Sequence, residues 1–169
     1  MIFLIKTISA VLLLSGCTLA GKLIADNQKD RCEYQRSIIS FLSAAENRLK
    51  STRMPFTELI NEMSRYEEYP AFLKKCSALL SGGESLNKAW KISLDCDENI
   101  KKTDSGKLLC SMGNQLGATD IDGQLSCIGC CRRELEKLLV AEEEKSKKYS
   151  GVFPALGVLA GVWAVILFL

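Results

Sequence analysis

Histidine is the most informative absence from this chain. None of the 169 residues is histidine, so the commonest general base and the commonest metal ligand are both missing. The sequence also contains neither a Walker A loop nor a GxGxxG motif. Its formal net charge is only +2, which gives no sign of a nucleic-acid-binding surface. We therefore expect no catalytic residue, no cofactor, no metal site, no nucleic-acid partner and no small-molecule substrate.

Charged side chains are almost missing from the two ends of the chain. Lys6 is the only one before Lys22, and none follows Lys148. The apolar run at 149–169 has the length that a helix needs to cross a bilayer, and a lysine near a helix end such as Lys6 can snorkel to the interface. The sequence thus predicts transmembrane helices at 1–21 and 149–169, with a polar domain at 22–148 between them.

The positions of the cations predict the orientation of these two spans. Cations cluster at the inner ends of both spans, at Lys22, Lys29, Arg31, Lys145, Lys147 and Lys148. Cytoplasmic segments beside membrane helices carry an excess of lysine and arginine. We therefore expect a two-pass protein of the cell membrane, with the central domain in the cytoplasm and both termini outside.

The central domain shows helical periodicity and no strand-like alternation. Apolar residues recur at three- and four-residue spacing in six stripes, at 34–49, 56–63, 72–80, 86–94, 108–116 and 125–139. Pro55, Gly82-Gly83 and Gly117 separate successive stripes, and Thr119 has the residue type of a helix N-cap. The predicted fold is all-α: a small antiparallel helical bundle flanked by N- and C-terminal transmembrane helices.

The chain contains eight cysteines, whose thiols are candidates for redox chemistry or metal binding. Cys127, Cys130 and Cys131 would lie within one helical turn of each other, as a thiol redox pair or part of a zinc site requires. A structural zinc needs four ligands, and no second CxxC motif is present. The alternative, which we favour, is that they are small apolar side chains packed near the core.

Leu14-Ser15-Gly16-Cys17 permits two interpretations. It has the form of a lipoprotein cleavage box, in which case Cys17 would be acylated and the body of the protein exported, with a thiol-active role in the cell envelope. The other interpretation is an uncleaved membrane helix. The cation excess between the spans favours the uncleaved helix, because a lipoprotein would place those cations outside.

Small residues recur at four-residue spacing in both predicted spans. Gly157 and Gly161 form a GxxxG motif, and Gly16 and Ala20 offer a matching face in the first span. Such faces let two membrane helices approach closely. Glycine and alanine are also frequent in membrane helices, so chance composition is the alternative explanation of this spacing. We give helix packing and chance composition equal weight. Helix packing at these four residues is the only site that the sequence predicts.

Several segments, in their order along the chain, carry a family resemblance. They are Met54-Pro55-Phe56-Thr57-Glu58-Leu59, Ala89-Trp90, Leu116-Gly117-Ala118-Thr119-Asp120 with Gln124, and Leu156–Gly161 before the apolar terminus. Together with the two spans they resemble the stage III sporulation protein AB family over nearly the whole chain. The cluster at 127–131 and Cys17 lie outside the family pattern.

The resemblance implies a structural role in endospore formation. Proteins of this family belong to a membrane complex between mother cell and forespore, and their soluble domain is similar to the helical cytoplasmic domain of type II secretion and type IV pilus platform proteins. The expected partners are the membrane and other stage III sporulation subunits, with the complex's ATPase as a candidate. The expected location of the domain is the mother-cell side, and no catalytic residue is implied.

Overall fold

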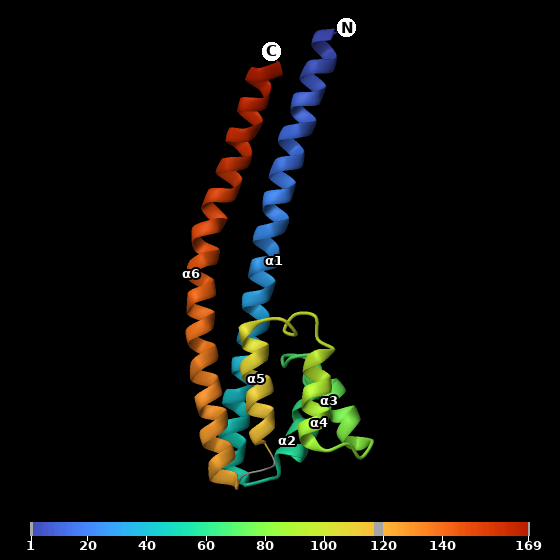
Figure 1. Ribbon diagram of the computed structural model, residues 1–169, viewed down its shortest axis with the longest axis vertical. Helices are drawn as coiled ribbons and strands as arrows, with labels where there is room; N and C mark the ends of the chain where they lie inside the picture. The colour runs from blue at the N-terminus through green and yellow to red at the C-terminus, as the bar shows by residue number, and fades with distance from the viewer. Residues whose placement is uncertain (1, 117–119, 169) are drawn as a thin grey trace. The chain divides into compact units, whose positions relative to one another are not determined.

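The computed structural model describes residues 2–116 and 120–168; in 2–25 and 148–168 it describes side-chain surroundings only at Gly16, Leu23 and Leu159. Six helices and no strand occur in this described part (Figure 1). They are α1 (Ile2–Thr52), α2 (Phe56–Met63), α3 (Phe72–Ser81), α4 (Leu86–Asp95), α5 (Asp104–Gln115) and α6 (Ile121–Phe168). The predicted all-α class is confirmed.

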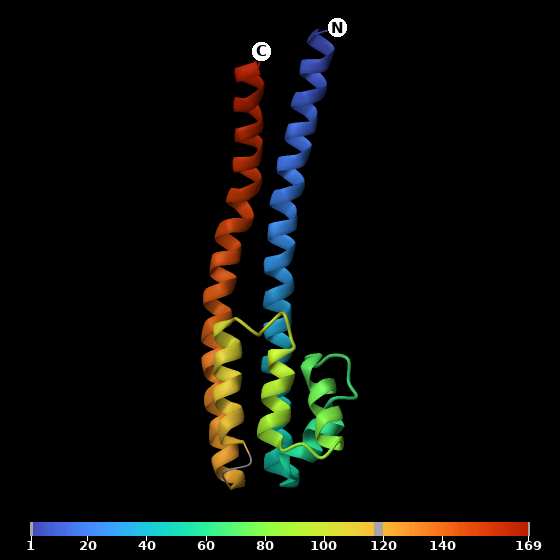
Figure 2. The ribbon, with the colours of Figure 1, turned by 45° about the vertical axis from the view of Figure 1, so that its right-hand side comes forward.

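The chain divides into two compact units. Unit 1 comprises residues 1–32 and 141–169, and unit 2 comprises Glu33–Val140. Unit 2 contains α2 to α5 together with the second part of α1 and the first part of α6. Within unit 2, α1 and α6 run antiparallel, with α5 beside them and α3 on the side of the unit away from α6 (Figure 2).

The helix boundaries of unit 2 follow from local sequence. α1 ends where Arg53 adopts a positive φ of 50°, two residues before Pro55. α3 ends in a Schellman motif: Gly83 has a φ of 88°, and the Glu84 and Gly83 amides donate to the Leu79 and Leu80 carbonyls at 3.1 and 3.0 Å. The predicted stops at Pro55 and Gly82-Gly83 are therefore confirmed.

The last two helices begin with side-chain caps. The Gly106 amide donates to Thr103 Oγ1 at 3.1 Å, so α5 begins at Asp104 rather than at the first residue of its apolar stripe, Leu108. At α6 the Gly123 amide donates to Asp120 Oδ1 at 3.0 Å. The Thr119 cap predicted for this helix lies outside the described residues.

The core of unit 2 is centred on Trp90. Its indole is fully buried, lies with ring centroids 5.3 to 6.3 Å from Phe72, Phe56 and Phe41, and donates from Nε1 to the Leu109 carbonyl at 2.9 Å. Burial of each large apolar side chain contributes about 1.5–3 kcal/mol. Helices α1, α2, α3 and α5 therefore pack together around Trp90.

Two polar contacts tie α1 to the far end of α4 and the start of α5. The Tyr34 hydroxyl donates to Asp97, and Gln35 donates through Nε2 to Ser105 Oγ. Burial, followed by the hydrogen bond to Asp97, raises the pKa of Tyr34, so this hydroxyl stays protonated. These contacts fix where α1 enters unit 2.

Among the residues whose side chains are described, no helix is long and apolar enough to cross a membrane. The predicted spans at 1–21 and 149–169 lie outside that part of the chain, with the exceptions of Gly16 and Leu159. The backbone at 2–21 belongs to α1 and that at 149–168 to α6, and each helix also includes residues of unit 2.

Candidate functional site: a groove between α1 and α6

An open groove of about 590 Å³ runs between α1 and α6 on the surface of unit 2. On α1 its lining follows one helical face, because the residues recur at three- and four-residue spacing. They are Arg36, Ile39, Ser40, Ser43, Ala44 and Asn47. Ser40, Ser43 and Ala44 are small, so they make a shallow floor that is distinct from the buried stripe of the same helix, which includes Phe41, Leu42 and Ala45.

The α6 side of the groove changes from polar to apolar along its length. Arg132 and Glu136 line the part nearer the start of α6, and Leu139 and Val140 line the part nearer the boundary of unit 2. Val140 is 55% exposed. On α6 the lining is therefore charged in one part and apolar in the other, while α1 adds the cationic side chain of Arg36.

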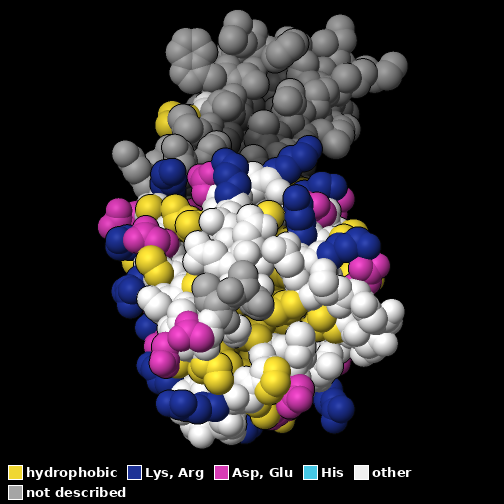
Figure 3. Space-filling view, turned by 60° about the horizontal axis from the view of Figure 1, so that its bottom comes forward, with side chains coloured by type: hydrophobic (Ala, Val, Ile, Leu, Met, Phe, Trp, Pro, Cys, Tyr) yellow, Lys and Arg dark blue, Asp and Glu magenta, His cyan; other side chains and the backbone are white. Residues whose placement is uncertain are grey.

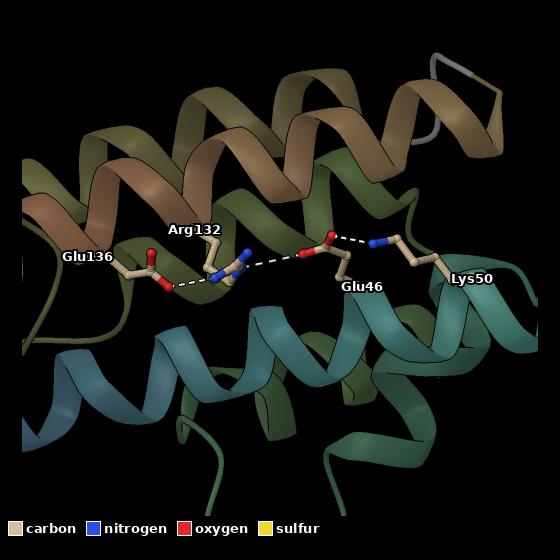
Figure 4. Close-up of polar contacts among 4 residues, drawn as sticks. All are labelled: Glu46, Lys50, Arg132 and Glu136. Atoms are coloured by element: carbon tan, nitrogen blue, oxygen red, sulfur yellow. Dashed lines mark hydrogen bonds and ion pairs between the residues drawn. The ribbon is translucent and has the colours of Figure 1, made fainter.

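Four side chains of α1 and α6 form a continuous ionic network beside this charged part (Figure 4). Glu46 accepts from Lys50 Nζ at 2.7 Å on its own helix and from Arg132 Nε at 3.3 Å across the groove. Arg132 Nη1 also donates to Glu136 at 2.6 Å. The network joins α1 to α6 within unit 2.

The electrostatics of the network suit a structural role. The hydrogen bond from Lys50 and, more weakly, the charge of Arg132 lower the pKa of Glu46 below its ordinary value. Glu46 is therefore ionised at neutral pH and is a poor general acid. Over the residues that the structure describes, no group of three or more potential metal ligands is found.

The cysteine cluster divides between the core and the surface. Cys131 is buried in the core of unit 2, Cys127 is partly buried against it, and Cys130 is exposed. Burial, with the neighbouring thiols as smaller causes, raises the pKa of Cys131 to about 12, and burial also raises the pKa of Cys127. Reactive cysteines and zinc ligands need a lowered pKa, so this arrangement favours packing for Cys127 and Cys131.

The helix-packing residues predicted from sequence do not lie in this groove. Gly16 is exposed, and a Cβ added to it would meet nothing within 4 Å. The surroundings of Ala20, Gly157 and Gly161 lie outside the described residues, as do those of Cys17. Close packing of these four small residues stays a prediction.

A family model described as stage III sporulation protein AB matches residues 6–169. The chain belongs to the stage III sporulation protein AB family. The match includes the whole of unit 2 and nearly all of the two apolar ends, so the resemblance carried by the short segments is confirmed. No curated protein and no solved structure matches the chain. Similarity to the secretion platform domain therefore stays a prediction.

Sequence reasoning missed the groove of this stage III sporulation protein AB family member. The available signal was a second face of α1, in which Ser40, Ser43 and Ala44 repeat beside the apolar stripe. That face of α1 becomes one wall of a groove only because α6 lies beside it. Glu46 and Arg132 are 86 positions apart, and no spacing rule brings them together.

Proposed function

We propose that this chain is a non-enzymatic structural subunit of the stage III sporulation complex between mother cell and forespore. In this proposal, transmembrane helices at 1–21 and 149–169 anchor a helical domain at 22–148 on the cytoplasmic, mother-cell side. The domain docks other subunits, with the complex's ATPase as a candidate partner. The observation that carries the proposal is the family match, which extends over the domain and both apolar ends together.

The surface of unit 2 supports docking rather than chemistry. On the face drawn in Figure 3, cationic and anionic side chains alternate around exposed apolar groups. The groove described between α1 and α6 is open, and two of its charged residues, Arg132 and Glu136, pair with each other. Protein–protein interfaces are on average about as polar as the rest of a protein surface, so such a surface is compatible with docking.

Deletion of the gene tests the role in sporulation. The deletion strain should form far fewer heat-resistant spores while growing normally, and an ectopic copy should restore them. Affinity purification of the ectopic, tagged copy from sporulating cells should then recover other stage III subunits. A deletion strain with wild-type spore numbers would refute the proposal.

An exported lipoprotein acylated at Cys17, with a thiol-active envelope role, is the second candidate, because Leu14-Ser15-Gly16-Cys17 has the form of a cleavage box. Intact-mass measurement of the membrane-extracted protein separates the two candidates. We expect the mass of the unprocessed chain. A mass that lacks residues 1–16 and includes a diacylglyceryl group would favour the lipoprotein.

A further inference from the structure

We propose that Cys127 and Cys130 are a peroxide-sensitive pair of thiols, which closes to a disulfide and distorts the turn of α6 that contacts α1. Packing explains two of the three clustered cysteines, since Cys131 is buried in the core and Cys127 is partly buried against it. Cys130 is exposed, so packing does not explain it. The inference concerns the chemistry of this helix and does not rest on the proposed function.

The helix brings these two thiols within reach of each other. Cys127 and Cys130 are three residues apart in α6, which places their Cα atoms about 5 Å apart. A disulfide needs Cα atoms roughly 4.4–6.8 Å apart. Burial, followed by the neighbouring Cys130 thiol, raises the pKa of Cys127, so the two groups already interact in the reduced protein. The bond can therefore form within a single turn of α6.

Exposure determines which thiol reacts first. Hydrogen peroxide reaches Cys130 at the surface, whereas Cys127 is partly buried. The Cys130 sulfur attacks one peroxide oxygen, the O–O bond breaks, and Cys130 becomes a sulfenic acid. The hydroxide that leaves takes up the thiol proton and becomes water.

Cys127 then acts as the resolving thiol. Its sulfur attacks the sulfenic sulfur of Cys130, so that the S–S bond forms and the S–O bond breaks. The hydroxyl group leaves as water with the Cys127 proton. Two thiols are oxidised and one peroxide is reduced to two molecules of water. A sulfenic acid is electrophilic, so Cys127 needs no lowered pKa for this second step.

Gly129 lies between the two cysteines and links their closure to α1. Side chains three residues apart on a helix have Cβ atoms about 5–6 Å apart, and a disulfide draws them to about 3.8 Å. The turn must therefore tighten, and it contains glycine, a weak helix former. A Cβ added to Gly129 would lie 3.8 Å from Oε1 of Glu46, which pairs with Arg132 (Figure 4). Tightening of this turn thus disturbs the contact between α6 and α1.

Peroxide treatment of the purified, reduced, full-length protein tests the proposal. Remaining thiols are blocked with a maleimide, and peptide 108–132 is fragmented in a mass spectrometer. The peptide should be lighter by two hydrogen atoms and should contain a bond between Cys127 and Cys130, which dithiothreitol reverses. Cys96 is the internal comparison, because it is exposed but has no other cysteine within ten residues of sequence. It should form no disulfide.

Two variants identify the resolving thiol. In Cys127→Ala, the Cys130 sulfenic acid should persist, and its adduct with dimedone should increase about fivefold over the parent protein. Cys131→Ala is the matched control, and it should keep the bond between Cys127 and Cys130. Circular dichroism checks that both variants are folded. A bond to Cys131 or Cys110, a bond between two copies, no bond at all, or equal dimedone adducts in parent and Cys127→Ala would overturn the proposal.

Hydrogen exchange measures the effect of closure on α6. Amides of residues 127–133 should exchange about threefold faster in the oxidised protein, while those of α3 should not change. The same peroxide treatment of Cys127→Ala should leave exchange at 127–133 unaltered. Equal exchange in the oxidised and reduced parent protein would show that closure does not distort the turn, and would overturn the switch. The spore count of the deletion strain is independent of these outcomes, so the proposed function is judged separately.

Discussion

Trp90 illustrates how closely single residues determine the packing of unit 2. Its indole lies against Gly113 of α5, where an added Cβ would be 2.2 Å from Trp90 Cδ1. Glycine is costly inside a helix, by about 1 kcal/mol relative to alanine. Here it lets the indole approach the α5 backbone closely enough to donate to the Leu109 carbonyl.

Replacement of Gly113 should therefore destabilise the fold. Gly113→Ala should lower the free energy of unfolding by about 1–3 kcal/mol, because the indole must shift in a close-packed core. Gly129→Ala is the matched control, since its Cβ would have only ordinary contacts, the nearest at 3.7 Å. It should leave stability unchanged or raise it slightly. Urea unfolding of both variants measures the difference, and equal effects would contradict the packing described.

The thiols of unit 2 should differ in reactivity according to burial. Maleimide should label the exposed Cys96 and Cys130 of the purified, folded protein, while Cys76 and Cys131 react only after unfolding. Burial raises the pKa values of these two thiols to about 11 and 12, which adds to their protection. Peptide mass spectrometry locates the label. Rapid labelling of Cys131 would contradict its placement in the core.

If the cluster serves packing, replacing Cys127, Cys130 and Cys131 together by alanine should leave sporulation largely intact. A loss of about 1 kcal/mol per buried site is expected from the smaller side chains. Zinc bound at one ion per chain, and lost with function in the triple variant, would contradict this prediction.

At the scale of helices, sequence periodicity identified the elements but not all of their ends. The stripes located all six helices, since each buries an apolar face. The apolar stripe by itself does not mark the start of α5, which lies four residues before Leu108, because Asp104–Lys107 is polar and the cap at Thr103 depends on a hydrogen bond rather than on hydrophobicity. The groove could not be predicted, because it arises from the register of α1 against α6.

The contact between α1 and α6 should depend on pH. Because the folded-state pKa of Glu46 lies below its ordinary value, 4.5, its ionised form stabilises the fold at pH values above that number. This contribution is lost as pH falls through the folded-state pKa. Glu46→Gln should thus lower the melting temperature at pH 7, by the equivalent of up to about 1 kcal/mol, and the difference from wild type should shrink below pH 4.5.

Glu134→Gln is the control for this measurement. Glu134 pairs with Lys137 on the same helix at 2.7 Å, so it does not join α1 to α6. Its replacement should leave the melting temperature close to that of wild type at both pH values. A pH-independent effect of Glu46→Gln would show that the ionic network does not stabilise the fold.

The predicted GxxxG motif leads to a separate prediction for the C-terminal part of α6. If Gly157 and Gly161 contact a partner helix, replacing both by leucine should disrupt complex assembly without preventing membrane insertion. Leucine holds helices apart but is favourable in hydrocarbon. Co-purification of stage III subunits and spore counts measure the outcome. Normal assembly and spore yield in the double-leucine strain would show that the motif reflects composition only.

At the scale of the whole molecule, the chain has a helical unit, unit 2, and two apolar ends. The cations at 22–31 and 145–148 are the sequence evidence for a cytoplasmic domain, and the family match includes both ends with unit 2. The two candidate functions place the domain on opposite sides of the membrane. Its location is therefore the property that separates them.

Labelling of native cysteines with a membrane-impermeant maleimide in intact sporulating cells determines on which side of the membrane unit 2 lies. Cys96 and Cys130 are exposed on unit 2, so they report its location without substitution. With a cytoplasmic domain, both thiols should stay unlabelled in intact cells and become labelled once the cells are lysed. Labelling of either thiol in intact cells, with a cytoplasmic control protein unlabelled, would place the domain outside and contradict the account.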